Sequence, residues 1–384
     1  MHQIKSTAII YGIIHFLVDF CCAFFMFSLG PLTEDFYIGF LIYNFLAFAM
    51  QMPVGLIADR IEKNSLTAAA GCLFVLGALG ASWLYPKSEN MMWAALSLAG
   101  IGNCLFHVGG GIEVMKRSAD KATPLGIFVS PGAVGIFLGT LYRKQEKELG
   151  SVLMFLLLGT ALLLICSSRK QLRKIEEILG TEDVVYGKAE VWETEAPDYT
   201  HKNTKHLGLI IRVMICFFLV VVFRSYLGMI AAFPWKDTVF SGTMALAAVF
   251  GGKLAGGFLA DKWGVQRTAV VTLLTSSLLF LFSDFMVAGV LAVFFFNMSM
   301  PITLYLAAKV LGRQNGFAFG ILTFAIFVGF LPAYAGLSRC NSLILSGLSL
   351  ASLIFLGIGA CLCQRMFEEN RVKAGGNTKE DTVS

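Results

Sequence analysis

The sequence predicts an all-α membrane protein whose twelve transmembrane helices form two pseudo-symmetric six-helix bundles. Composition is the first reason: 57% of the 384 residues are hydrophobic and 14% are charged, against about 45–50% and about 25% in ordinary soluble domains. The second reason is the number of long apolar runs, and the third is an internal repeat. A soluble enzyme of this composition is not expected.

A span needs about 20 apolar residues to cross about 30 Å of hydrocarbon, so the chain has room for twelve spans joined by short loops. The first apolar run is too long for a cleavable signal peptide and leads into another span. Of the nine cysteines, only Cys340 falls in a loop, and the others are interpreted as small packing residues. The expected spans are 8–30, 36–58, 65–85, 91–115, 122–142, 149–168, 207–233, 239–260, 267–285, 286–308, 316–337 and 341–364.

Charge orients these spans. Six of the 30 Lys and Arg residues fall in the expected outer loops, three lie in or at the rim of spans, and the remaining 21 face inward if both termini are cytoplasmic. Cytoplasmic loops carry an excess of Lys and Arg, so we expect a multi-pass protein of a bacterial inner membrane with both termini inside. Topology then accounts for the net charge of +5, and no nucleic-acid partner is expected.

One long hydrophilic segment divides the chain. The expected organisation is an N-terminal bundle, a cytoplasmic linker loop, a C-terminal bundle and a cytoplasmic tail, at 1–168, 169–206, 207–364 and 365–384. The linker begins RKQLRKIEEIL, whose apolar spacing suits a short helix on the inner membrane surface. A solvated linker is the plainer alternative.

A repeat relates the two halves. The strings GLIADR and GFLADK place Asp59 and Asp261 202 residues apart, and Pro131 and Pro332 are 201 residues apart. We interpret the two prolines as mid-span residues of the fifth and eleventh spans. A duplicated six-helix unit explains both offsets, and many secondary transporters are built in this way.

The recurring G-x-x-x-D-[RK] motif at the inner ends of spans 2 and 8 resembles the loop motif of the major facilitator superfamily. Its glycine allows close helix approach, and its aspartate at a helix end can bind backbone or basic groups and hold one state closed. In the first copy Glu62 and Asn64 replace the second glycine and the last basic residue, so we expect the second copy to matter more. The expected gate residues are Gly55, Asp59, Arg60, Gly257, Asp261, Lys262, Gly264 and Arg267.

Charged side chains at membrane depth are candidates for function because they are costly there. His15 and Asp19 in span 1 are four residues apart, on one helix face, and could share a proton. An Asp inside a span can be neutralised by protonation, which suits proton coupling. A permanent pairing of Asp19 with a cation is the structural alternative. A sodium site is disfavoured, because only Asp19 and Asn44 offer obvious oxygen ligands in the first two spans.

Span 4 carries Asn103, His107 and Glu113 in an apolar run, and its Gly109–Gly111 triplet permits a local helix break. Irregular backbone at membrane depth is tolerated where it lines a cavity, so His107 is a candidate substrate-binding residue together with Asn103. Glu113 lies six residues from His107, on another face, and is a candidate for proton coupling or for pairing with a nearby Lys or Arg.

The C-terminal half supplies cations at membrane depth. Arg224 in span 7 lies within one turn of the repeat equivalent of Asp19, and we expect it to face Asp19 or to bind a carboxylate or phosphate. Lys253 in span 8 lies about 12 Å along the helix from Asp261. It is either a substrate-binding residue or a lysine that snorkels to the rim. Tyr226 in FRSYLG is the remaining candidate for substrate binding.

Within the superfamily, IIHFLVDF, FHVGGGIEVMKR and FRSYLG together resemble the fosmidomycin-resistance-type branch. The resemblance implies a proton-linked transporter of small organic molecules, with His15, Asp19, His107 and Arg224 at the polar positions of the branch. We therefore expect a monomeric secondary transporter in the lipid bilayer that moves a small polar solute, an anion among the candidates, by proton-coupled alternating access. The alternatives are an exporter of lipophilic compounds and a transporter-derived sensor. No metal or cofactor is expected.

Overall fold

Every regular element in the described part of the chain is a helix. The computed structural model describes residues 2–29, 36–84, 89–118, 120–144, 150–180, 204–337 and 341–380. The first half holds α1 (His2–Leu29), α2 (Phe36–Asn44), the π-helical turn η2 (Phe45–Ala49), α3 (Gln51–Ile61), α4 (Asn64–Leu84), α5 (Glu89–Lys116), α6 (Thr123–Lys144) and α7 (Gly150–Gly180). The second half holds α8 (Thr204–Ile230), α9 (Val239–Trp263), α10 (Val265–Phe280), α11 (Met286–Asn297), α12 (Ser299–Leu311), α13 (Asn315–Tyr334) and α14 (Ser342–Glu380).

Eleven helical stretches among the described residues are long and apolar enough to cross a membrane. The ninth predicted span, 267–285, is instead the shorter apolar helix α10, which ends at Phe280. The chain turns after this point, where the Ser283 amide donates to the Phe280 carbonyl and the Trp235 indole donates to the Ser283 carbonyl at 2.9 Å. These contacts end α10 five residues before the predicted boundary.

The second predicted span is divided by a feature that the sequence did not indicate. Its residues form α2, η2 and α3, and the Met50 amide donates to the carbonyl of Phe45, five residues earlier. π-helical turns of this kind are uncommon and recur at functional sites. This one changes the helical phase just before Gln51, which lies close to the site described below.

The glycine triplet of span 4 does not break its helix, so that prediction is wrong. α5 is continuous through Gly109, Gly110 and Gly111. An added Cβ at Gly110 would lie 3.1 Å from the Tyr11 ring, and one at Gly111 would lie 2.8 Å from the Phe319 ring. The triplet therefore provides room for neighbouring helices on several sides of α5.

The helix of span 6 also continues beyond its predicted end. α7 runs to Gly180, so the beginning of the predicted linker extends this helix instead of forming a separate surface helix. No Gly or Pro interrupts residues 160–179, and nothing in the local sequence stops the helix. The remainder of the predicted linker, 181–203, lies outside the described residues.

The two prolines of the predicted repeat occupy different places in their helices. Pro131 is the ninth residue of α6, whereas Pro332 lies two residues before the end of α13. The mid-span interpretation of Pro332 is therefore wrong, and the shared proline offset does not mark equivalent positions. The two motif aspartates remain as a marker of the repeat.

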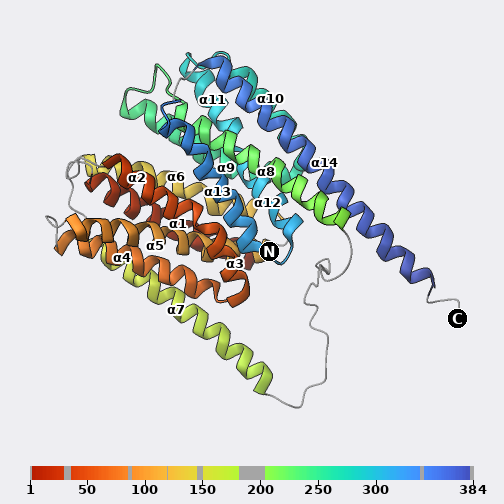
Figure 1. Ribbon diagram of the computed structural model, residues 1–384, viewed down its shortest axis with the longest axis horizontal. Coiled ribbons are helices and arrows are strands. Elements are labelled where there is room, and N and C mark those ends of the chain that lie inside the picture. The colour runs from red at the N-terminus through yellow and green to blue at the C-terminus, as the bar shows by residue number, and fades with distance from the viewer. Residues whose placement is uncertain are drawn as a thin grey trace. The chain divides into compact units, whose positions relative to one another are not determined.

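The chain divides into two compact units that follow the two halves except at α6 and α13. The first comprises Met1–Ala119, Ile127–Asp198 and Gly312–Phe327, and the second comprises Asp120–Gly126, Tyr199–Leu311 and Val328–Ser384. Within the first unit, α4 packs on both α5 and α7 (Figure 1). Within the second unit, α14 packs along α8 and α10 (Figure 1).

Close helix packing in each unit depends on glycines. Gly135 and Gly139 of α6 pack directly against the backbone carbonyl groups of Phe16 and Phe20 in α1, as their small-xxx-small spacing predicts. Gly252 of α9 backs onto α11 in the same way. The α1–α6 seam determines how closely α6 approaches the polar residues of α1.

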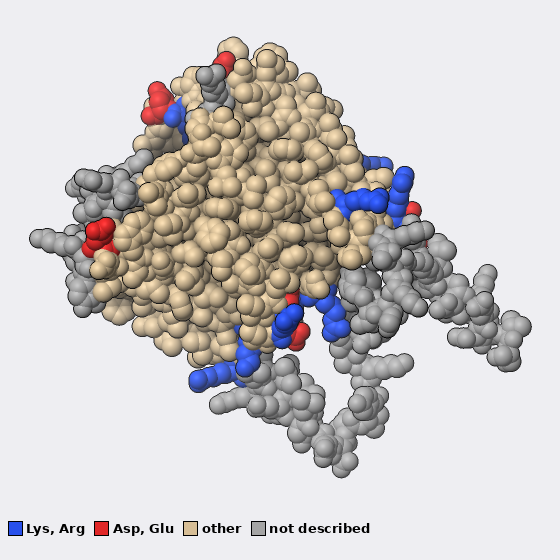
Figure 2. All heavy atoms as spheres, viewed as in Figure 1, with Lys and Arg blue, Asp and Glu red and all other residues tan. Residues whose placement is uncertain are grey.

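The described surface is strongly apolar. In Figure 2, most of the described surface in view carries no Lys, Arg, Asp or Glu side chain. Phe155 of α7 is 76% exposed and Val287 of α11 is 72% exposed. Large apolar side chains exposed in such numbers indicate an integral multi-pass membrane protein.

Candidate functional site

A buried polar cluster in the first unit begins with two residues of α1. His15 Nε2 lies 3.1 Å from Asp19 Oδ2, because residues four apart project from the same helix face. Both residues are buried, and both lie well inside the span Ser6–Ser28. The structure thus brings together the pair that the sequence predicted.

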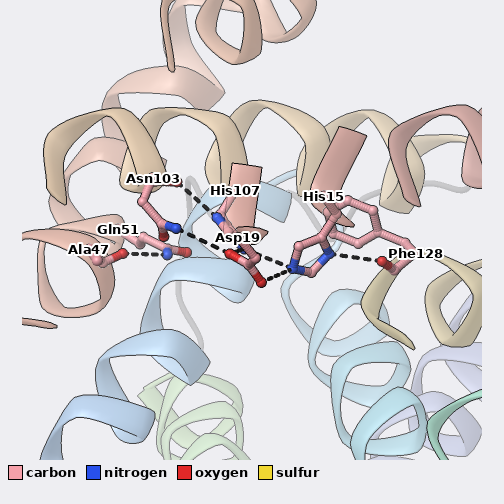
Figure 3. Close-up of polar contacts among 7 residues, drawn as sticks. All are labelled: His15, Asp19, Ala47, Gln51, Asn103, His107 and Phe128. Carbon is pink, nitrogen blue, oxygen red and sulfur yellow. Dashed lines mark hydrogen bonds and ion pairs between the residues drawn. The ribbon is translucent and has the colours of Figure 1, made fainter. Parts of the chain in front are cut away.

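α5 supplies the other two members of the cluster (Figure 3). Asn103 Nδ2 donates to Asp19 Oδ1 at 3.2 Å, and His107 Nε2 lies 3.6 Å from the same oxygen. His107 Nε2 also lies 2.9 Å from His15 Nε2. His107, predicted as a substrate-binding residue, is therefore a direct partner of the predicted proton-coupling pair.

Hydrogen bonds to carbonyl groups fix the tautomers of both histidines. His15 Nδ1 lies 2.8 Å from the Phe128 carbonyl oxygen, and His107 Nδ1 lies 2.9 Å from the Asn103 carbonyl oxygen. A carbonyl oxygen can only accept, so each Nδ1 carries a hydrogen. In neutral imidazoles both Nε2 atoms would then be bare acceptors.

Two bare acceptors repel each other, yet the two Nε2 atoms are 2.9 Å apart. That separation is the length of an N–H···N hydrogen bond. A proton bound at this point could be shared between the two Nε2 atoms, next to the Asp19 carboxylate. One side-chain nitrogen or oxygen atom from each of His15, Asp19 and His107 lies within 4.8 Å of the other two. A single proton could therefore bind to any of the three side chains.

α6 closes the cluster from a third side. Gly132 faces the α1 pair so closely that a Cβ there would overlap His15 Nε2 and lie 2.5 Å from Asp19 Oδ2. Pro131 removes one backbone hydrogen bond in this turn of α6, beside the Phe128 carbonyl that holds His15. Gly132 is not among the residues predicted from the sequence, because its importance depends on which helix packs against it.

Glu113 does not join this cluster. It is buried and pairs with Arg117 at 2.9 Å, one turn along α5. The predicted pairing with a nearby basic residue is confirmed for Arg117. A part for Glu113 in proton coupling stays a prediction.

Arg224 belongs to the second unit. Val220 and Val221, one turn before it on α8, are both 0% exposed, and Leu227 is buried one turn after it. Arg224 therefore lies on the buried side of α8. Its Nη1 is shielded from solvent and has no hydrogen-bond partner in the described part of the protein. The predicted pairing with Asp19, which lies in the other unit, stays a prediction.

The other two candidate binding residues of the C-terminal half differ in what the structure shows. The Tyr226 hydroxyl donates to the Leu337 carbonyl at 2.9 Å, just beyond the end of α13. The Tyr226 side chain therefore holds the backbone of the segment that follows α13. Lys253 is half-buried in α9, and its part in substrate binding stays a prediction.

Both motif aspartates cap the N-terminus of a helix from the opposite half of the sequence. Within the first unit, Asp59 accepts hydrogen bonds from the amides of Gly316 and Phe317, at the start of α13, at 2.7 and 2.9 Å. The first amides of a helix have no partner within the helix, so a carboxylate there is favourable. The departures at positions 62 and 64 leave this contact in place, because it needs only the carboxylate and the helix end.

Within the second unit, Asp261 makes the corresponding cap at the start of α6. It accepts from the amides of Ala122 and Thr123 at 2.8 and 3.0 Å, and from the Thr123 hydroxyl. A Cβ at Gly257 would lie 2.7 Å from the Ala122 carbonyl. The motif glycine therefore allows the close approach that the cap requires.

The second glycine of the motif ends its helix with a positive φ. Gly264 has φ 87°, and Glu62, at the same place in the first copy, has φ 57°. The two residues differ in ψ, which is 151° at Gly264 and 14° at Glu62, so only Glu62 is left-handed helical. A side chain is disfavoured at positive φ, so Glu62 is under backbone strain. The basic motif residues Arg60, Lys262 and Arg267 are not buried.

Comparisons with known proteins point to the fold. No family model matches the sequence, and no curated protein matches it. A crystal structure of a single-substitution variant of the fucose:proton symporter FucP of E. coli matches with a TM-score of 0.59 at 14% identity, over 92% of this chain and 98% of that chain. A major facilitator superfamily transporter, FucP in its outward conformation, matches with a TM-score of 0.55 at 15% identity, over 91% and 99%. The chain therefore has the fold of these transporters.

Proposed function

We propose that the protein is a proton-coupled secondary transporter of the major facilitator superfamily. In this proposal twelve spans form two six-helix bundles, and a small polar organic solute crosses by alternating access. The fold likeness to a fucose:proton symporter over nearly the whole chain supports the transporter class. The local strings shared with the fosmidomycin-resistance-type branch support a place in that branch.

The observation that carries proton coupling is the His15–Asp19–His107 cluster. Its geometry would allow one mobile proton to be shared by two imidazoles beside a carboxylate, at membrane depth, where an unbalanced charge is costly. Loss of that proton would leave two neutral rings with opposed lone pairs and an unbalanced Asp19. The protonated and deprotonated clusters therefore favour different arrangements of α1, α5 and α6, which is the requirement for linking a proton to a conformational change.

The two aspartate caps supply the proposed gate. Each joins a helix of one half of the sequence to a helix of the other half, through a few hydrogen bonds at a helix end. Contacts of this kind can break and re-form as the halves rock. With cytoplasmic termini, as the Lys and Arg bias favours, both caps would lie on the inner side and close it.

Arg224 supports an anionic solute. A buried guanidinium nitrogen without a partner in the described residues favours an acceptor, and a carboxylate or phosphate can bind the guanidinium in a bidentate manner.

Proteoliposomes with an imposed pH gradient test the proposal. Asp19→Asn keeps the shape of the side chain and removes its charge, so uphill transport should cease while solute exchange persists in part. Asp284→Asn, at an exposed position after α10, is the matched control and should transport normally. Uphill transport by Asp19→Asn at the rate of the unchanged protein would eliminate this cluster as the coupling site.

A further inference from the structure

Among the described residues, one group of side chains has the composition and spacing of a metal site. It consists of His15 and Asp19 of α1 and His107 of α5, all three of them buried. One ligand atom from each side chain lies within 4.8 Å of the other two. Their positions in the sequence do not indicate a metal, because 92 positions separate His15 from His107 and only the packing of α5 on α1 joins them.

The separations of these atoms are those of ligands around a single ion. The two Nε2 atoms are 2.9 Å apart, His15 Nε2 is 3.1 Å from Asp19 Oδ2, and His107 Nε2 is 3.6 Å from Asp19 Oδ1. Imidazole nitrogen and carboxylate oxygen bind Zn²⁺ at about 2.0–2.2 Å. Two ligands at that distance are about 2.9 Å apart for a right angle at the ion and about 3.4 Å apart for a tetrahedral angle. Small side-chain movements therefore suffice to complete a coordination shell.

The hydrogen bonds of both histidines are those of metal-binding imidazoles (Figure 3). His15 Nδ1 lies 2.8 Å from the Phe128 carbonyl oxygen, and His107 Nδ1 lies 2.9 Å from the Asn103 carbonyl oxygen. A carbonyl oxygen can only accept, so each Nδ1 donates and each Nε2 is the atom left to bind an ion. Histidines that bind metals commonly donate their other ring N–H in this way. A proton on either Nε2 does not alter the argument, because metal binding displaces it.

The Asp19 carboxylate is held in a comparable manner. Asn103 Nδ2 donates to Asp19 Oδ1 at 3.2 Å, and carboxylates that bind metals are themselves hydrogen-bonded. The negative charge of Asp19 offsets part of the charge of a divalent ion, which is costly to bury unpaired. Gly132 of α6 faces His15 Nε2 and Asp19 Oδ2, so no side chain of α6 competes for the space beside these two ligand atoms.

The donor set selects the class of metal. Imidazole suits Zn²⁺, Ni²⁺ and Cu²⁺, whereas Mg²⁺ and Ca²⁺ prefer shells made of oxygen. Closed structural zinc sites have four protein ligands, and a site with three leaves one position to water. The cluster therefore fits an exchangeable transition-metal ion better than a permanent structural one.

We propose that His15, Asp19 and His107 form a binding site for a divalent transition-metal ion, of which Zn²⁺ is the representative. The ligand atoms are the two Nε2 atoms and the Asp19 carboxylate, so a bound ion joins α1 to α5. The ion and the proposed coupling proton need the same nitrogen lone pairs and exclude each other. This inference goes beyond the proposed transport function, because metal binding follows from the ligand geometry whether or not the protein transports a solute.

Metal binding by the purified full chain tests the site without any transported solute. The chain is prepared without a histidine tag and freed of metal with a chelator. We expect Co²⁺ to bind with visible absorption bands that Zn²⁺ abolishes by displacement and that Mg²⁺ at the same concentration leaves unchanged. X-ray absorption of the zinc-loaded, unchanged protein should show two imidazole ligands. Zn²⁺ should also raise the unfolding temperature, since it binds the folded state.

Asp19→Asn and His107→Gln each remove one ligand and should weaken Zn²⁺ binding by about tenfold or more in competition with a chromogenic chelator. Asp284→Asn makes the same change as Asp19→Asn at an exposed position and is the matched control, which should keep the full affinity.

Three results would overturn the metal site. The first is Zn²⁺ binding no tighter than Mg²⁺ binding by the unchanged protein. The second is undiminished affinity in both ligand variants, since the ion would then bind elsewhere in the chain. The third is an X-ray absorption spectrum without imidazole ligands, which decides the matter even if a variant fails to fold. None of these measurements involves transport, so failure of the metal site leaves the proposed function to be tested by its own experiment.

Discussion

Loss of either aspartate cap should release the first amides of one helix. Asp59 accepts two backbone hydrogen bonds from the start of α13, and Asp261 accepts two from the start of α6. A hydrogen bond to a charged group contributes about 1.5–3 kcal/mol. We take the lower end because both carboxylates are partly exposed. Two bonds then amount to about 3 kcal/mol, which corresponds to a roughly 100-fold change in the opening equilibrium of the capped turn.

Amide hydrogen exchange followed by mass spectrometry measures this opening directly. In Asp59→Ala, exchange of the Gly316 and Phe317 amides should accelerate by about 100-fold, while the Ala122 and Thr123 amides remain protected. Asp261→Ala should show the reverse pattern. Asp261→Ala should also have the larger effect on transport, because Asp261 holds the Thr123 hydroxyl as well.

The exposed substitution Asp284→Ala should change neither region. Unaltered exchange at Gly316 and Phe317 in Asp59→Ala would refute the capping argument. Acceleration across the whole chain in either variant would show that the aspartates act on global stability, not on one helix end each.

Four further changes have defined outcomes. His107→Gln removes one of the two nitrogens that share the proton, so the pH profile of uphill transport should move to lower pH; an unmoved profile would exclude His107 from the proton site. Gly132→Ala should destabilise the fold by about 1–3 kcal/mol through overpacking against the α1 pair, seen in thermal unfolding, whereas Gly228→Ala, with open space around it, should not. Glu62→Gly should stabilise the fold by about 1 kcal/mol by relieving a left-handed conformation, and a lower unfolding temperature would contradict this. Arg224→Lys should weaken binding of an anionic solute by about 1–3 kcal/mol in titration calorimetry; unchanged affinity would remove Arg224 from the binding site.

Local patterns in the sequence determined the helical membrane class, eleven of the spans and the contact between His15 and Asp19. Each depends on composition or on spacing within one helix, and helical geometry alone turns that spacing into proximity. The cap-forming aspartates were also recognisable, because their motif occurs twice. The repeated motif does not indicate which helix ends the two aspartates contact.

Tertiary packing decided the composition of the site. His107 meets His15 across 92 positions of sequence, and Asp59 meets Gly316 across 257. Such contacts depend on which helices are neighbours and at what level they pack, and short-range periodicity carries no information about either. The change of helical phase at η2, just before Gln51, matters only because α5 packs against it. The missing side chain at Gly132 matters only because α1 packs there. The hydrogen bonds from both Nδ1 atoms to carbonyl oxygens then turn the two Nε2 atoms toward each other, which no spacing of residues could reveal.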